Sequence, residues 1–166
     1  PSWIMQGYTT MGMEITEQLH GVVPTHIFLQ AENGVTHLLE TKHQKLIVEG
    51  DENIELLCDG DWLTEALINL LKNASDYSGE NTNIRLRVEH TNVYTRIYVE
   101  DEGVGIPENE LVNIFKRFYR VHNEVNPNSV GIGLSLAKSI VEGMGGRISV
   151  KSEEKKGTSF SLTFCK

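Results

Sequence analysis

An amphipathic segment at residues 61–79 constrains the fold of this chain more than any other stretch. At about 100° of rotation per residue, its leucines and Ala74 fall on one side of a helix, and polar residues gather within an arc of roughly 100° on the other. Asp61 is a suitable N-cap and Ser78-Gly79 is a suitable stop, so the sequence predicts both ends of this helix. The polar face consists of Glu65, Asn69, Lys72, Asn73 and Asp76.

Two asparagines one turn apart, Asn69 and Asn73, are unusual on such a face. The Asn amide competes for backbone hydrogen bonds, so a face that only meets solvent is more readily built from Glu, Lys or Gln. The helix alone leaves two interpretations open: a binding site, or a solvent-facing helix that tolerates two asparagines.

Length and composition limit the classes of function. A chain of 166 residues fits one domain, or one domain with a short extension. The formal charge of −8 argues against a general nucleic-acid binder, so an anionic ligand has to be met by local positive charge. No apolar run approaches the ~18 residues that span a bilayer, which favours a soluble, cytoplasmic piece. Cys58 and Cys165 form no CxxC pair and are expected to be free thiols.

The hydrophobic periods predict an α+β fold, with about three helices on one face of a mixed sheet of about six short strands. Residues 1–24 show no readable pattern and are taken as an N-terminal extension, whereas 25–166 form the domain. A turn at Gly50-Asp51 is expected to join the first two strands as a hairpin. The further predicted elements are helices at 25–41, 108–115 and 133–144, and strands at 45–49, 53–59, 83–88, 93–99, 147–152 and 158–164.

The run DEGVGIP at 101–107 follows directly after a predicted strand, where binding residues are commonly displayed. Gly103 and Gly105 let the backbone adopt φ > 0 and let a flat ligand approach without Cβ interference. The carboxylate of Asp101 can accept a hydrogen bond from an exocyclic amine. A glycine-bearing turn with a solvated Asp is the alternative reading of this run alone.

The run GIGLSLAK places Gly131 and Gly133 just before a helix, where free N–H groups and the helix dipole suit a polyphosphate. It matches neither the dinucleotide fingerprint nor a Walker loop. A glycine N-cap without a ligand remains the alternative. Lys116, Arg117 and Arg120 supply the local positive charge that an anion needs in this acidic chain.

The order of these motifs resembles the ATP-binding catalytic domain of sensor histidine kinases, within the ATPase superfamily that includes gyrase. NLLKNASDYS is similar to the N box, DEGVGIP to the first glycine box and FKRFYR to the F box. GIGLSLA is similar to the second glycine box, and Gly157-Thr158 to the third. The resemblance covers residues 25–166 and implies a two-layer α/β sandwich, the Bergerat-type ATP-binding fold, with a flexible lid at about 119–130.

The resemblance also implies roles for individual residues. Asp101 would bind the adenine amine, and Arg120 would stabilise the transferred γ-phosphoryl group. Asn73, with Asn69, would coordinate Mg²⁺, for which amide oxygens are suitable ligands. Phe115 and Phe118 would anchor the lid by packing. The other implied nucleotide contacts are Lys72, Tyr77, Gly103, Gly105, Ile106, Gly131, Gly133, Leu134 and Thr158.

Two positions depart from the family pattern. Asp76 stands where many sensor kinases have a phosphate-contacting Lys, and Lys72 on the same face is a candidate to compensate. Gyrase-type relatives carry Asp at this place, so nucleotide binding is expected to survive, whereas an acid here repels phosphate and works against efficient phosphotransfer. Ser135 replaces a glycine of the second glycine box, which is a milder change.

The family's phosphoacceptor, a His followed by an acid with Pro five positions on, is not found. His20 is followed by Gly21, and Pro24 comes four positions on, so the chain is expected to be a fragment. We therefore expect a catalytic domain that transfers the γ-phosphoryl group of ATP to a histidine on a separate dimerisation domain. A response regulator would act downstream in the cytoplasm, and the isolated fragment would be monomeric. The alternatives are a nucleotide-binding regulatory module without effective phosphotransfer and an anti-sigma-type serine kinase.

Overall fold

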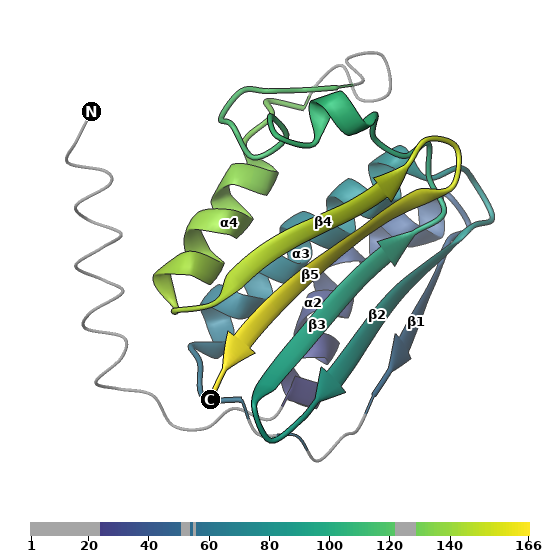
Figure 1. Ribbon diagram of the computed structural model, residues 1–166. Coiled ribbons are helices and arrows are strands. Elements are labelled where there is room, and N and C mark those ends of the chain that lie inside the picture. The colour runs from purple at the N-terminus through teal and green to yellow at the C-terminus, as the bar shows by residue number, and fades with distance from the viewer. Residues whose placement is uncertain (1–23, 51–53, 55, 122–128) are drawn as a thin grey trace.

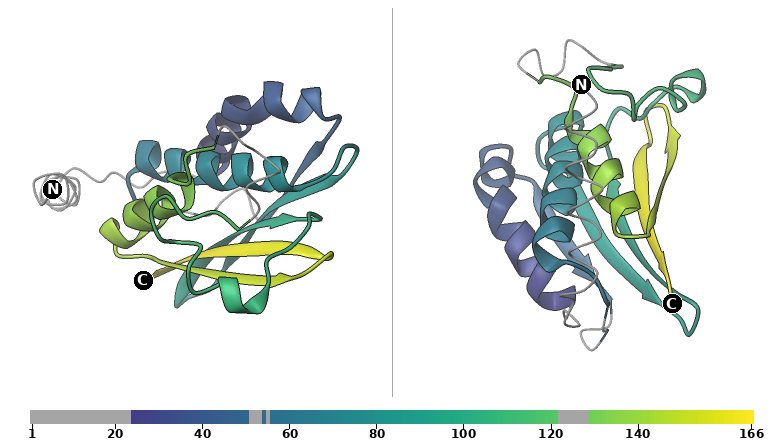
Figure 2. Two further views of the ribbon diagram at one scale, coloured as in Figure 1. Left: turned by 90° about the horizontal axis from the view of Figure 1, so that it is seen from above. Right: turned by 90° about the vertical axis from the view of Figure 1, so that its left-hand side faces the viewer.

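The computed structural model describes residues 24–50, 54, 56–121 and 129–166. Within them, three helices lie against one face of a five-stranded mixed sheet, and the figures show the two layers from three directions (Figure 1, Figure 2). This arrangement confirms the two-layer α+β fold predicted from the sequence. The N-terminal extension predicted at 1–24 lies outside the described residues apart from its last position.

The sheet has the strand order β1-β2-β3-β5-β4. β1 pairs with β2 in parallel, and every other neighbouring pair is antiparallel. Side chains alternate between the two faces along each strand, and the apolar ones face the helices. The strands are β1 (Lys45–Glu49), β2 (Asn83–His90), β3 (Tyr94–Asp101), β4 (Arg147–Glu153) and β5 (Gly157–Cys165).

The helices are α2 (Pro24–Thr41), α3 (Gly60–Tyr77) and α4 (Gly133–Gly143). α3 is the central helix and contacts both α2 and α4 (Figure 2). Its predicted apolar side is buried, with Leu63, Leu67 and Leu70 all at 0% exposure. Burying one leucine side chain stabilises a fold by about 1.5–3 kcal/mol, so this side fixes the rotation of α3. No helix among the described residues combines the length and the apolarity needed to cross a membrane.

The predicted start of α3 is wrong by two residues. Asp59, not Asp61, is the N-cap, because its extended backbone (φ −75°, ψ 114°) lets the side chain accept a hydrogen bond from the N–H of Trp62. The distance from Asp59 Oδ1 to this nitrogen is 3.0 Å. Asp61 lies in the first turn, where a negative charge also suits the helix dipole.

The strand predicted at 53–59 is wrong for the residues that the structure describes there. Leu56 makes a single β bridge, while β1 pairs with β2 instead of forming the expected hairpin. The alternation itself is present, because Ile54, Leu56 and Cys58 are buried and Leu57 is 68% exposed. The period of two therefore predicted which side chains are buried, but it did not predict which strand pairs with β1.

The helix predicted at 108–115 is much shorter in the structure. The structure has one 3-10 turn, η1 (Glu108–Glu110), followed by turns. Pro107 fixes the entry to this segment, and the following residues bond to carbonyls three positions back, as Asn113 does with Glu110. The segment predicted as an α-helix is therefore a series of tight turns.

The C-terminal end of α3 is held by the segment that follows α2. The side-chain amide of Gln44 lies 3.2, 3.3 and 2.9 Å from the carbonyl oxygens of Ser75, Ser78 and Gly79. The hydroxyl of Ser75 donates back to Gln44 Oε1 at 2.6 Å. Lys42 Nζ adds a bond of 2.7 Å to the Ser75 carbonyl. These bonds satisfy carbonyls that a helix end leaves without partners.

Replacing Gln44 with Ala is expected to destabilise the domain by about 2–3 kcal/mol, because buried carbonyls and the Ser75 hydroxyl lose their partner. For a domain of this size, this lowers the melting temperature by roughly 5 °C or more. Gln30→Ala on α2 is the control, because it removes an exposed amide whose bond from the Thr64 hydroxyl is long, at 3.3 Å, and it should change stability by less than Gln44→Ala does. Equal melting temperatures for the two variants would contradict the capping role.

Candidate functional site

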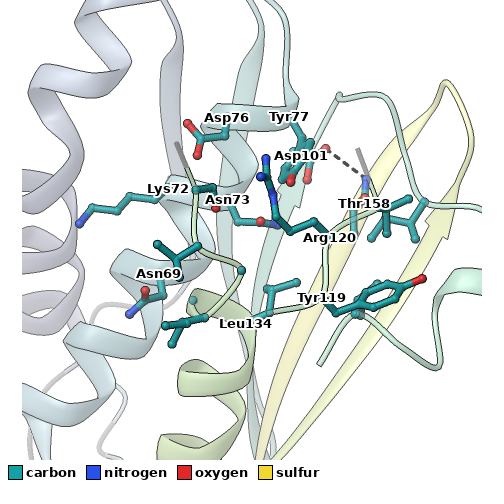
Figure 3. A pocket seen from close by; sticks show the side chains of 18 of the residues that line it. Asn69, Lys72, Asn73, Asp76, Tyr77, Asp101, Tyr119, Arg120, Leu134 and Thr158 are labelled. Atoms are coloured by element: carbon teal, nitrogen blue, oxygen red, sulfur yellow. Dashed lines mark hydrogen bonds between the residues drawn. The ribbon is translucent and has the colours of Figure 1, made fainter. Parts of the chain in front are cut away.

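A cavity of about 540 Å³ lies between α3, the start of α4 and the end of β3 (Figure 3). It brings together every site residue predicted from the sequence except Gly103. The predicted residues in its wall are Asn69, Lys72, Asn73, Tyr77, Asp101, Gly105, Ile106, Arg120, Gly131, Gly133, Leu134 and Thr158. The wall also includes Asp76, which the sequence analysis placed on the polar face of α3, and Tyr119, Val121, Ser129 and Val130 of the expected lid. Ile114 and Ile132 are the wall residues that the sequence analysis did not connect with the site.

Asp101 is the last residue of β3 and lies opposite Thr158 of β5. Its Oδ1 atom accepts a hydrogen bond from the N–H group of Gly103 at 2.8 Å. It also accepts one from the N–H group of Thr158 at 3.2 Å (Figure 3). Burial raises the pKa of Asp101 to about 6, although both N–H bonds act to lower it. The carboxylate is therefore fixed through one oxygen, and Oδ2 takes no part in these two bonds.

The two glycines after Asp101 serve close packing. Gly105 has φ +72°, and a Cβ there would lie 2.1 Å from the carbonyl oxygen of Glu153. Gly103 lies outside the cavity wall, and a Cβ there would lie 2.5 Å from the carbonyl oxygen of Tyr77. Gly103 thus lets the loop touch the end of α3, and only Gly105 reaches the place expected for a ligand-lining glycine.

Asn69 presents its carbonyl oxygen rather than its amide nitrogen to the cavity side. Its Nδ2 atom donates to the backbone oxygen of Glu65 at 2.8 Å and to Glu65 Oε1 at 3.0 Å. The Oδ1 atom consequently faces Gly133, 3.2 Å from where a Cβ would stand on that glycine. Amide oxygens are hard ligands that suit Mg²⁺. Among the described residues, no cluster of three or more His, Cys, Asp or Glu offers a different metal site.

The start of α4 forms the other end of the cavity. Its N-cap, Ile132, makes no side-chain capping bond, so the first N–H groups of the helix suit an anion. Gly131 has φ +74°, and a Cβ there would lie 2.9 Å from the Tyr119 carbonyl oxygen. The hydroxyl of Ser135 donates to the Ile132 carbonyl at 2.8 Å, so this departure from glycine is accommodated within the first turn.

The two phenylalanines expected to anchor the lid differ from one another. Phe115 packs edge-on against Phe160 of β5, with ring centroids 6.2 Å apart, as expected for an anchor. Phe118 is 69% exposed and has φ +64°, so its side chain turns outward and its role as a packing anchor is wrong. Its N–H instead bonds to the Gly131 carbonyl at 2.9 Å. Most of the expected lid, residues 122–128, lies outside the described part of the chain.

One end of the expected lid makes a further contact that the sequence analysis missed. The hydroxyl of Tyr119 donates to the Glu110 carboxylate, which links the lid to η1. The signal available in the sequence was only an acidic residue nine positions before a tyrosine, and no regular element gives that spacing a meaning.

The charged residues of the wall do not pair as the sequence suggested. Lys72 is exposed, and its side chain points away from Arg120 and Asp101 (Figure 3), so it does not offset Asp76. Arg120 instead points toward Tyr77 (Figure 3). Burial, more than any neighbouring charge, raises the pKa of Tyr77 above its ordinary value.

Residues 58–166 match the family described as histidine kinase-, DNA gyrase B-, and HSP90-like ATPase, and the chain belongs to this family. This family and the cavity define an ATP-binding domain. Its relatives within the family indicate that the chain is a catalytic domain of the sensor histidine kinase type.

The sensor histidine kinase YclK of Bacillus subtilis is 32% identical over 144 residues, which cover 85% of this chain and 28% of that protein. The sensor protein kinase WalK of Staphylococcus saprophyticus is 38% identical over 116 residues, 68% of this chain and 19% of WalK. The chain thus spans less than a third of these curated relatives. The solved catalytic domain of histidine kinase ThkA superposes with a TM-score of 0.78 at 23% identity, over 90% of this chain and 96% of that one.

The raised pKa of Asp101 predicts a pH-dependent stability. The folded state holds this proton more tightly than the unfolded chain, so the unfolding free energy falls as the pH rises from about 4 to about 6. The pKa of about 6 against an ordinary 3.8 corresponds to at most about 3 kcal/mol. Asp101→Asn removes the titration, so its stability relative to wild type should increase over this pH range and then level off. Denaturant unfolding from pH 4 to pH 8 measures the difference, and a constant difference would contradict the buried carboxylate.

Proposed function

We propose that this domain transfers the γ-phosphoryl group of bound ATP to a histidine on a separate dimerisation domain. The supporting observation is the cavity itself, which joins a buried carboxylate that can accept an amine to a helix start suited to an anion. The sequence similarity to proteins named sensor histidine kinases supports the reaction class.

At one end of the cavity, Asp101 would accept a hydrogen bond from the amine of adenine, in the same buried environment that raises its pKa. Gly105, Ile106 and Thr158 would surround the base. Ile106 is fixed there because its N–H donates to the hydroxyl of Ser152 at 2.8 Å. This end therefore contributes orientation and specificity rather than reaction chemistry.

At the other end, the N–H groups at Gly131, Gly133 and Leu134 would meet the phosphates. Asn73 and Asn69 would hold Mg²⁺, and the orientation of the Asn69 oxygen by Glu65 fits this role. Mg²⁺ held there would supply positive charge that offsets the negative charge of the phosphates. Arg120 would stabilise the charge of the γ-phosphoryl group as it is transferred.

A nucleotide-binding regulatory module without effective phosphotransfer is the second candidate, and Asp76 is the observation that favours it. This acid lies in the cavity wall, and Lys72 points away from the cavity (Figure 3). A carboxylate near phosphates repels them unless a cation stands between. Binding and transfer are therefore tested separately.

The surroundings of the domain form part of the proposal. Residues 25–166 would act as one catalytic unit, because α2 packs against α3 although the family match begins at residue 58. The phosphoacceptor would lie in a dimerisation domain of the same parent protein, and a response regulator would receive the phosphoryl group. The unit would work in the cytoplasm as part of a membrane-bound sensor and be monomeric alone.

Thermal unfolding with and without ATP and Mg²⁺ tests nucleotide binding. Ligand at ~100 times its dissociation constant should stabilise the domain by about 2.7 kcal/mol, or roughly 5 °C or more. Asn73→Ala should abolish the Mg²⁺-dependent part of this shift. Asn92→Ala, an exposed asparagine in the β2–β3 turn, is the matched control and should keep the shift. A wild-type chain that shows no shift at saturating nucleotide would contradict the proposed site.

Phosphotransfer is tested by supplying a histidine-bearing helical domain from a sensor kinase in trans, with radiolabelled ATP and Mg²⁺. The expected product is an acid-labile phosphohistidine, whose formation falls at least tenfold in Arg120→Gln because a charge-assisted contact to the phosphoryl group is lost. Proven ATP binding without phosphohistidine would favour the regulatory module. An acid-stable phosphoserine on a partner would instead indicate a serine kinase.

A further inference from the structure

Thr158 stands between two neighbours in the sheet, at the end of the cavity that the proposed function assigns to the base. It lies opposite Asp101 of β3 on one side and opposite Ser152 of β4 on the other. Side chains of directly opposite residues lie on the same face of a sheet, so these three gather on the face that carries the helices. Thr158 and Asp101 line the cavity, whereas Ser152 is not among the residues of the described wall.

The hydroxyl of Ser152 makes three hydrogen bonds, and together they fix the direction of each proton. Its oxygen lies 2.9 Å from the carbonyl oxygen of Gly157, 2.8 Å from the backbone nitrogen of Ile106 and 2.9 Å from the hydroxyl oxygen of Thr158. A carbonyl can only accept, so Ser152 donates its single proton to Gly157. The backbone N–H of Ile106 donates to Ser152. All three bonds therefore form together only when the Thr158 hydroxyl also donates its proton to Ser152.

The hydroxyl proton of Thr158 is thus used inside the protein, and so are backbone N–H groups around it. The N–H groups of Gly103 and Thr158 both donate to Oδ1 of Asp101. The N–H of Val104 donates to the carbonyl of Tyr77 at 3.1 Å. These donors are taken, whereas the ionised carboxylate of Asp101 and the lone pairs of the Thr158 hydroxyl oxygen are acceptors. This end of the cavity therefore suits a ligand group that donates hydrogen bonds.

We propose that Ser152 is a positioning residue that sets the base selectivity of the cavity, because it takes the hydroxyl proton of Thr158 and leaves this hydroxyl only an acceptor toward the ligand. The class of ligand that fits is a nucleotide whose base presents an amine to Asp101 and Thr158, as adenine does. A base with a carbonyl oxygen at the same place, as in hypoxanthine, meets lone pairs and is disfavoured. This inference rests on the proposed function, because it requires a nucleotide in the cavity.

Calorimetric binding of Mg²⁺-ATP and Mg²⁺-ITP tests the proposal, because ITP carries hypoxanthine in place of adenine. The quantity measured is the ratio of the dissociation constant of ITP to that of ATP. Ser152→Ala frees the Thr158 proton for donation to the carbonyl oxygen of ITP, so this ratio should fall about three- to tenfold. Ser149→Ala, an exposed serine on the same strand, is the matched control and should keep the wild-type ratio. An unchanged ratio in Ser152→Ala, even with both affinities weakened, overturns the proposal, because Ser152 then only supports the structure.

Thr158→Val tests the route through Thr158, and it decides the question alone if the melting temperature shows that Ser152→Ala does not fold. Valine keeps the shape of threonine but removes the acceptor, so the ratio should fall in this variant as well. In the Thr158→Val background, Ser152→Ala should leave the ratio unchanged. A ratio that rises or stays constant in Thr158→Val overturns the proposal, as does an effect of Ser152→Ala that persists without the hydroxyl. Failure of the proposed function is seen separately, as a wild-type chain that binds neither nucleotide.

Discussion

The burial of one side of α3 is the constraint on which the rest of the structure depends. Leu63, Leu67 and Leu70 are inaccessible to solvent, so α3 cannot rotate without exposing them. At 3.6 residues per turn, this rotation turns Asn69 and Asn73 toward the cavity between α3 and the start of α4. The packing of the leucines in the hydrophobic core therefore determines the direction in which the two asparagines on the polar side of α3 point.

The second constraint on the site is the pairing of β3 with β5, which places Asp101 against Thr158. Both strands run through the core, so neither partner can shift without breaking a ladder of backbone bonds. The buried carboxylate that results has its pKa raised to about 6, which means that its charge destabilises the fold at neutral pH. A buried carboxylate of this kind is retained where a ligand needs it, and the packing of the hydrophobic core offsets its cost to the stability of the fold.

The sequence predicted the features that depend on periodicity and missed those that depend on contacts between distant residues. The buried leucines of α3 and the alternation of β2, β3 and β5 follow from local spacing. Gln44 was not predicted as a cap, because it lies 31–35 positions from the carbonyls that it binds. Phe118 was wrongly expected to pack, since its positive φ is set by a turn whose closure involves Gly131.

Charge explains how an acidic chain can accept a polyphosphate. The formal charge is −8, so the long-range field of the protein repels such a ligand, and the attraction has to be local. The open start of α4 and the guanidinium of Arg120 provide it at one end of the cavity. Asp76 works against them from the α3 wall, so the direction in which Arg120 points decides the net field at the phosphates.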